Sequence, residues 1–252
     1  MHEDTPIPQL SHPDWNHVAE IPIVDDGEPL VPLSLVPERI LVQPVYYIDR
    51  IPGAVPECYA REGVLERLLE ASDRLPPGVR LVVLDAWRPY EVQQFLYEHL
   101  EEVIRETEPG IDAGELSRRT REFVAPPSRD PRCPSPHLTG GAVDVTLCDR
   151  SGRLLPMGSE FDEVTARSHT GHYEDGAEEA EEVEEAVKNR RVLYHAMVNA
   201  GFTNLPSEWW HFDCGNQQWA WYSGEETASY GVIDLEPMAQ RWARQLGKGL
   251  KD

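Results

Sequence analysis

The sequence predicts an α+β protein, in which helices and strands of a single domain, residues 1–252, share one core. Segments with helical periodicity alternate with short apolar or alternating segments that are typical of strands. The 252 residues are 40% hydrophobic and 27% charged, as in ordinary globular proteins. No repeat or low-complexity linker divides the chain, which supports one domain.

The N-terminal region predicts little regular structure. Residues 1–40 contain seven prolines, which favour short extended pieces, and we expect this segment to wrap around the body. Residues 39–47 are expected to continue as irregular extended chain.

A helix, a buried strand and a second helix are predicted next. Residues 61–75 place apolar side chains on one helical face, and Pro76-Pro77-Gly78 ends that helix. The apolar run that starts at residue 79 predicts a buried strand, and Pro89 suits the first turn of the second helix. The apolar residues expected to face inward on this helix are Val92, Phe95, Leu96, Leu100, Val103 and Ile104. Arg88, at the tip of the strand, could serve a functional site or pair with Asp85 to hold the turn.

After a short helix expected within residues 111–134, the stretch 135–144 predicts half of a metal site. His137 and Asp144 are seven residues apart, which is about 10 Å along a helix and over 20 Å along a strand. Zinc ligands lie about 2 Å from the ion, so the chain must double back, and Gly140-Gly141 permits this. The alternation over residues 142–147 predicts a strand after the turn. The same pattern also fits a glycine-rich hairpin with an incidental histidine.

The last third predicts a helix and then a second informative stretch. Residues 174–185 hold eight acidic side chains in twelve, typical of a solvated helix start, and Gly201 closes that helix. Residues 206–212 predict a strand, with residues 217–222 as its hairpin partner. Glu208 and His211 would point to opposite faces of a regular strand, so we expect Glu208 at its irregular entrance. His169 and His172 are spaced like ligands, but their polar loop disfavours a metal site.

Together His137, Asp144 and His211 form a candidate zinc centre. Two histidines and a carboxylate leave a fourth position for water, which is characteristic of catalytic zinc. Glu208 beside that water could act as general base, and Arg88 could neutralise the oxyanion that develops on a scissile carbonyl. The combination predicts a metallohydrolase.

Four motifs in order resemble the VanX-type D-alanyl-D-alanine dipeptidase family. They are Asp85-Ala86-Trp87-Arg88-Pro89, Ser135-x-His137-x-x-Gly140-x-Ala142-x-Asp144, Met157-Gly158-x-x-Phe161-Asp162 and Glu208-Trp209-Trp210-His211. The resemblance covers roughly residues 60–222 and implies the zinc peptidase fold shared with D,D-carboxypeptidases and the Hedgehog signalling domain. In that fold a small antiparallel sheet is flanked by helices.

The resemblance also implies residue roles. It assigns one zinc ion per chain to His137, Asp144 and His211, the general base to Glu208, and stabilisation of the tetrahedral intermediate to Arg88. Ser135 resembles the serine that helps hold the substrate, and Asp162 matches an acid that receives the substrate ammonium. The family's substrate tyrosine is left unassigned, because the region from Tyr46 to Tyr59 departs from the usual pattern. A restricted cavity that admits dipeptides, and so spares peptidoglycan precursors, is implied as well.

Two alternatives stay open beside a D-Ala-D-Ala dipeptidase. One is a D,D- or L,D-carboxypeptidase that trims peptidoglycan stem peptides, and the other is a non-catalytic zinc-binding module. The formal net charge of −22 argues against nucleic acid and anionic membranes as partners. The resemblance implies a small dipeptide as the substrate. A homo-oligomer is not excluded.

The sequence also predicts where the protein is located in the cell and whether its cysteines are reduced. No stretch is apolar enough to span a bilayer, and the polar, acidic start from Met1 favours a cytoplasmic protein. The four cysteines form no C-x-x-C pair, so we expect reduced thiols.

Overall fold

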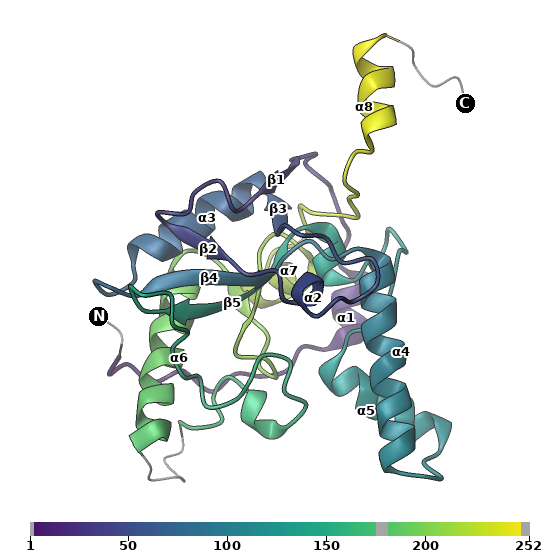
Figure 1. Ribbon diagram of the computed structural model, residues 1–252. Helices are drawn as coiled ribbons and strands as arrows, with labels where there is room; N and C mark the ends of the chain where they lie inside the picture. The colour runs from purple at the N-terminus through teal and green to yellow at the C-terminus, as the bar shows by residue number, and fades with distance from the viewer. Residues whose placement is uncertain (1–2, 175–180, 248–252) are drawn as a thin grey trace.

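A five-stranded sheet forms the centre of the computed structural model, which describes residues 3–174 and 181–247 (Figure 1). The strand order is β2-β4-β5-β7-β6, with the bounds Ile40–Val42, Arg80–Asp85, Ala142–Cys148, His211–Asp213 and Thr203–Asn204. The last four strands of this order pair antiparallel, as predicted. The edge strand β2 runs parallel to β4, so the sheet is not wholly antiparallel, and residues 40–42 are regular where irregular chain was predicted.

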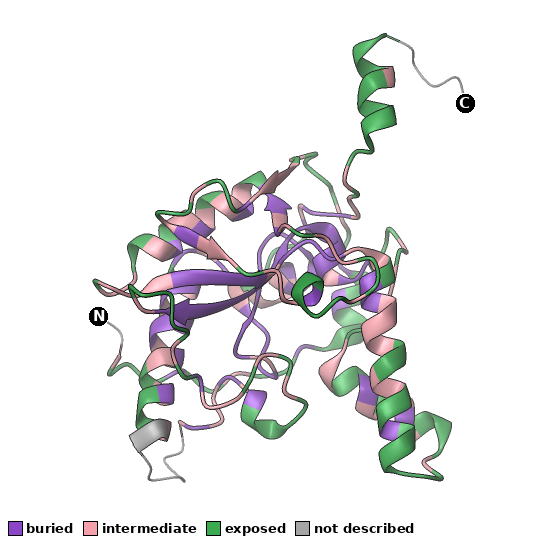
Figure 2. Cartoon of the chain, viewed as in Figure 1, coloured by how far each residue is buried: buried purple, intermediate pink, exposed green. Residues whose placement is uncertain are grey.

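The middle strands are buried and mostly apolar, with the polar residues Asp144 and Thr146 on one face of β5. All seven residues of β5 are buried, and Figure 2 shows β4 and β5 as the buried centre of the molecule. Helices α3 (Glu62–Asp73) and α6 (Glu181–Asn199) pack against each other and contribute Leu68 and Met197 to the same core. The acidic segment 175–180 lies outside the described residues. The described chain is therefore a mixed fold with a small sheet and flanking helices.

Helices α4 (Tyr90–Thr107) and α5 (Ala113–Phe123) pack side by side near one end of the sheet (Figure 1). The prediction that Val103 faces inward is wrong, since Val103 is 42% exposed while Ile104 is buried. Val103 points about 100° away from Ile104 around the helix, which places it outside the buried face at this turn.

The N-terminal segment contacts distant parts of the chain. It contains α1 (Trp15–Glu20) and β1 (Leu30–Pro32), and β1 pairs antiparallel with β3 (Tyr59–Arg61). The backbone N–H of Val24 donates to the carbonyl of Ala228 over 2.8 Å. The short elements of the remaining chain are α2 (Val45–Ile48), η1 (Pro136–Thr139), η2 (Ala166–Ser168) and α8 (Met238–Gln245).

The predicted strand at 217–222 is wrong, because these residues form helix α7 (Gln217–Ser223). The side chain of Asn216 accepts a hydrogen bond from the N–H of Trp219, which caps the helix start, and Gly224 ends the helix in the left-handed region at φ 71°. These end signals outweigh the strand preference of the aromatic residues, which is strongly context-dependent.

Helix α8 extends away from the body and buries none of its residues (Figures 1 and 2). In the part of the chain that the structure describes, no helix combines the length and apolarity needed to cross a membrane. All four cysteines are free, as predicted, and three of them are buried.

Candidate metal and catalytic site

A tight turn brings His137 back toward β5. His137 lies in η1, and Gly140 follows in the left-handed region at φ 70°. This conformation is accessible to glycine at little cost and reverses the chain directly before the strand that carries Asp144. The predicted doubling back at Gly140-Gly141 is confirmed.

Strand pairing brings the second histidine to the same place. His211 is the register partner of Asp144 across β5 and β7. Side chains directly opposite in an antiparallel pair point to the same face of the sheet. Two segments 67 residues apart therefore present an imidazole and a carboxylate side by side.

The three predicted ligands form a compact triangle. His137 Nε2 lies 3.2 Å from His211 Nδ1, which lies 3.2 Å from Asp144 Oδ1. Among the described residues, these three make up the group of His, Cys, Asp or Glu side chains that could hold a metal ion, and all three are buried. Neither His169 nor His172 belongs to such a group.

The orientation of His137 suits a cation. Its Nδ1 lies 2.7 Å from the carbonyl oxygen of Ala86, which can only accept, so the proton is on Nδ1 and the lone pair is on Nε2. That lone pair points at the ring of His211. Tetrahedral ligands about 2 Å from zinc are about 3.3 Å apart, close to the separation of the two nitrogens. The donor set and its spacing therefore fit zinc.

Glu208 lies at the entrance of the strand, as predicted. Its Oε2 is 3.7 Å from His211 Nδ1, and the turn is closed by the N–H of His211 bonding to the carbonyl of Glu208. Burial raises the pKa of Glu208 to about 8, with further contributions from Asp144 and Asp162. A bound dication would lower this pKa by favouring the carboxylate. The Glu208 carboxyl group thus lies beside the three candidate ligands.

Arg88 both pairs with Asp85 at the turn and reaches the candidate site, so the two interpretations of this residue apply together. Its Nε donates to Asp85 Oδ2 at 2.8 Å, its Nη1 to Gln93 Oε1 at 2.8 Å, and its Nη2 to Asp144 Oδ2 at 3.0 Å. Burial opposes its charge, but Tyr46, Asp85 and Asp144 outweigh burial and raise the pKa of Arg88. The arginine is therefore a fixed, buried cation that supports a candidate metal ligand and keeps two of its five N–H groups unused by these bonds.

Asp162 pairs with a tyrosine that the sequence analysis could not assign. Tyr46 donates its hydroxyl to Asp162 Oδ2 at 2.8 Å, and its ring lies over the Arg88 guanidinium, 4.7 Å from the ring centre. Burial raises the pKa of Asp162 to about 7, although Arg88 and the Tyr46 bond oppose the rise. No local signal marks Tyr46, because its partner is 116 residues away.

Ser135 lines the same cavity, but its hydroxyl is used locally. It donates to the carbonyl of Pro126 at 3.2 Å and accepts from the N–H of Ser128 at 2.8 Å. These bonds hold the loop before η1, and a role of Ser135 in holding substrate stays a prediction.

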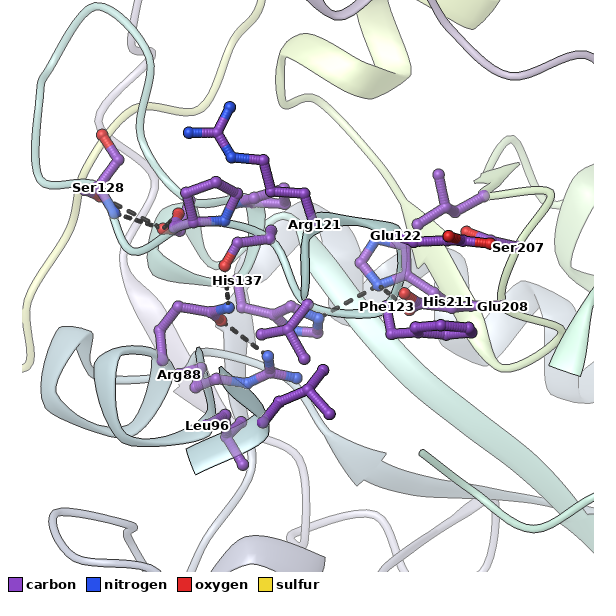
Figure 3. A pocket seen from close by; sticks show the side chains of 18 of the residues that line it. Arg88, Leu96, Arg121, Glu122, Phe123, Ser128, His137, Ser207, Glu208 and His211 are labelled. Carbon is purple, nitrogen blue, oxygen red and sulfur yellow. Dashed lines mark hydrogen bonds and ion pairs between the residues drawn. The ribbon is translucent and has the colours of Figure 1, made fainter. Parts of the chain in front are cut away.

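A cavity of about 1120 Å³ joins these groups (Figure 3). All seven predicted site residues line it, namely Arg88, Ser135, His137, Asp144, Asp162, Glu208 and His211. It continues along α4 and α5, where Leu96, Leu100, Phe123 and Val124 give it an apolar wall. Ligand cavities for drug-sized molecules are about 300–1,000 Å³, so this cavity has a larger volume than a dipeptide requires, and the restriction to dipeptides stays a prediction.

Comparison with known families identifies the protein class as a peptidase. The model of peptidase family M15 matches residues 54–227. The chain belongs to that family, which is described as D-ala-D-ala dipeptidase.

Curated relatives agree with this assignment. The chain is similar to a D-alanyl-D-alanine dipeptidase of Synechocystis sp., with 37% identity over 85% of this chain and 95% of the relative. Proteins of the same name from Escherichia coli and Enterococcus faecium are 32% and 30% identical, over 54% and 66% of this chain and 55% and 75% of the relative, respectively.

Proposed function

We propose that the protein is a zinc-dependent dipeptidase that hydrolyses D-Ala-D-Ala or a related dipeptide containing D residues. The observation that carries the proposal is Glu208, which lies beside His137, Asp144 and His211 in one cavity. A site that only stored metal would not need this fourth, raised-pKa carboxyl group. The family description and the names of the relatives support the dipeptide substrate.

His137, Asp144 and His211 would hold the zinc ion. When bound, zinc polarises a carbonyl and lowers the pKa of coordinated water to about 7. The ring of His137 is held by the Ala86 carbonyl, and Asp144 is held by Arg88, so both ligands are oriented before any ion arrives.

Glu208 would carry the proton through the reaction. Its carboxylate takes a proton from the attacking water and then delivers it to the nitrogen of the leaving D-amino acid. Arg88, which stays charged, would offer its remaining N–H groups to the oxyanion formed on the scissile carbonyl.

Asp162 and Tyr46 would recognise the free amino end of the dipeptide. Asp162 is exposed to solvent where it lines the cavity, and a bound substrate would displace the water that competes for its charge, which would strengthen its attraction for a cation. The substrate ammonium could thus replace solvent at Asp162, and an acylated amine could not. This requirement distinguishes a dipeptidase from an enzyme that trims longer peptides.

The volume of the cavity favours a second candidate function, that of a D,D- or L,D-carboxypeptidase acting on peptidoglycan stem peptides. A space of about 1120 Å³ that continues along α4 and α5 has room for more than two alanines. Asp162 speaks for the dipeptidase, because an internal amide offers it no positive charge.

A comparison of substrates tests the proposal. The zinc-loaded protein is assayed for release of D-Ala from D-Ala-D-Ala, from its N-acetyl derivative and from an acetylated tripeptide ending in D-Ala-D-Ala. We expect cleavage of the free dipeptide alone. Preferred cleavage of the acetylated tripeptide would instead establish the carboxypeptidase, and absence of any cleavage would leave a metal-binding module.

A further inference from the structure

The outer nitrogen of His211 faces a second buried carboxylate. His211 Nε2 lies 3.1 Å from Asp213 Oδ2, and Asp213 has no exposed surface. The two residues are two positions apart on β7, so their side chains share one face of the strand. The carboxylate therefore lies behind the imidazole, on the side away from His137 and Asp144.

Asp213 is itself held in place. The side-chain N–H of Asn216 donates to its other oxygen, Oδ1, at 2.6 Å. The carbonyl oxygen of the same Asn216 side chain accepts from the N–H of Trp219 at 3.0 Å and caps α7. A chain of hydrogen bonds thus runs from the start of α7 through Asn216 and Asp213 to the imidazole of His211.

We propose that Asp213 is a positioning residue that sets which nitrogen of His211 binds metal. A carboxylate can only accept, so it keeps the imidazole proton on Nε2 and leaves the lone pair on Nδ1. Nδ1 is the nitrogen that faces His137 Nε2 and Asp144 Oδ1, each at 3.2 Å. The inference rests on the proposed function only in that the ion is taken to lie between these three side chains.

The two histidines are supported by acceptors of different strength. His137 Nδ1 lies 2.7 Å from the backbone carbonyl of Ala86, with Asp85 Oδ2 farther away at 3.4 Å, whereas His211 Nε2 lies 3.1 Å from the carboxyl group of Asp213. A carboxylate behind an imidazole makes it a better donor to the metal, and loss of such a partner typically lowers metal affinity by about 10–100-fold. Removing the carboxylate of Asp213 is therefore expected to lower the affinity of the site for the metal.

The test measures zinc affinity rather than turnover. Zinc binding to the intact chain and to Asp213→Asn and Asp213→Ala is measured by competition with a chromogenic chelator. We expect Kd to rise about 10–100-fold in both variants. Asp25→Asn serves as the matched control, because Asp25 pairs with the buried Arg61 in a structural contact that involves none of the site residues. This control is expected to lower the melting temperature and to leave the zinc Kd within about twofold.

A second measurement uses the natural chain, so it tests the inference even if both Asp213 variants fail to fold. In the zinc-loaded, ¹⁵N-histidine-labelled natural chain, NMR should place the His211 proton on Nε2 and the metal on Nδ1. A proton on Nδ1, or folded Asp213 variants with unchanged zinc Kd, would overturn the inference. A natural chain that binds no zinc would instead refute the proposed function, so the two failures are distinguishable.

Discussion

At the scale of single residues, burial sets the chemistry of the site. Asp144 is buried, but its interactions with His137 and His211 outweigh burial and lower its pKa, so it stays ionised. Burial dominates at Glu208 and Asp162 and raises the pKa of both, to about 8 and about 7. The site therefore combines one carboxylate with a lowered pKa and two carboxyl groups with raised pKa values.

The first prediction concerns Glu208. Replacing it with Gln keeps the shape of the side chain but removes the proton acceptor, so we expect kcat to fall by about 10²–10⁴-fold, the usual contribution of a general base. Zinc stoichiometry, measured by elemental analysis, should stay at one per chain. The control is Glu122→Gln, which removes an exposed carboxylate from the wall of the same cavity and should keep kcat. Full activity of the Glu208→Gln protein would exclude the assigned base.

The second prediction is a pH dependence of substrate binding. Asp162 is ionised above its pKa of about 7 and neutral below it, so its attraction for an ammonium is lost as pH falls through that value. Binding of D-Ala-D-Ala to the Glu208→Gln protein, followed by calorimetry, should weaken about fivefold from pH 8 to pH 6. The ionised fraction of Asp162 falls about tenfold over this range, while the ammonium fraction of the dipeptide, whose amine has a pKa near 8, roughly doubles. Adding Asp162→Asn should flatten the profile. A profile that survives this substitution would contradict the role of Asp162.

At the scale of elements, the site depends on one turn and one strand register. The turn at Gly140 places His137 in the site, and the pairing of β5 with β7 places Asp144 and His211 side by side there. The turn follows from local sequence, namely the glycine pair. The pairing of β5 with β7 was not predicted, because residues 206–212 were expected to pair with residues 217–222, which form a helix. The meeting of the three ligands was expected from their residue types and from the order of the motifs. The register itself is fixed by burial, because a slip of one residue would turn Asp144 out of the site.

The third prediction tests the turn. In Gly140→Ala the added Cβ would lie 2.6 Å from Leu30 Cδ2 at a φ of +70°. We expect a loss of about 1–2 kcal/mol in the free energy of unfolding from the left-handed backbone alone, together with lower activity as His137 shifts. Gly152→Ala is the matched control, because it has a φ of +82° and no atom within 4 Å of the added Cβ. It should show a similar loss of stability with normal activity.

Other parts of the site and fold could not be predicted because their causes are distant in sequence. Tyr46 becomes a site residue only through Asp162, and Asp213 only through the ring of His211 and the cap of α7. The prediction of a strand at 217–222 was wrong because the side chain of Asn216 caps a helix there, which outweighs the strand preference of the aromatic residues. Kinship with the Hedgehog signalling fold stays a prediction.

At the scale of the whole molecule, one buried arginine joins the N-terminal segment, the turn and the C-terminal segment. Arg61, which is 1% exposed, donates to the carbonyls of Glu28, Thr139 and Gly231. It also pairs with Asp25 at 2.8 Å. The guanidinium of Arg61 thus links the N-terminal segment, the turn before β5 and the C-terminal segment.

The fourth prediction follows from this arrangement. Arg61→Ala would leave buried carbonyls without this donor, and Asp25, whose side chain is 35% exposed, without its partner. An unsatisfied buried acceptor costs about 1–3 kcal/mol. Denaturant unfolding should show a loss of about this size. Arg118→Ala, which removes an exposed arginine paired with Glu115 and Glu122, should leave the free energy of unfolding nearly unchanged. Equal losses in the two variants would contradict the role of Arg61.

The most direct test of the central claim is an anomalous difference map at the zinc edge from crystals of the zinc-loaded protein. The account predicts one peak about 2.0–2.2 Å from His137 Nε2, Asp144 and His211 Nδ1. The peak should be lost after chelation, together with hydrolysis of D-Ala-D-Ala. A peak elsewhere, or hydrolysis that persists without the ion, would contradict it.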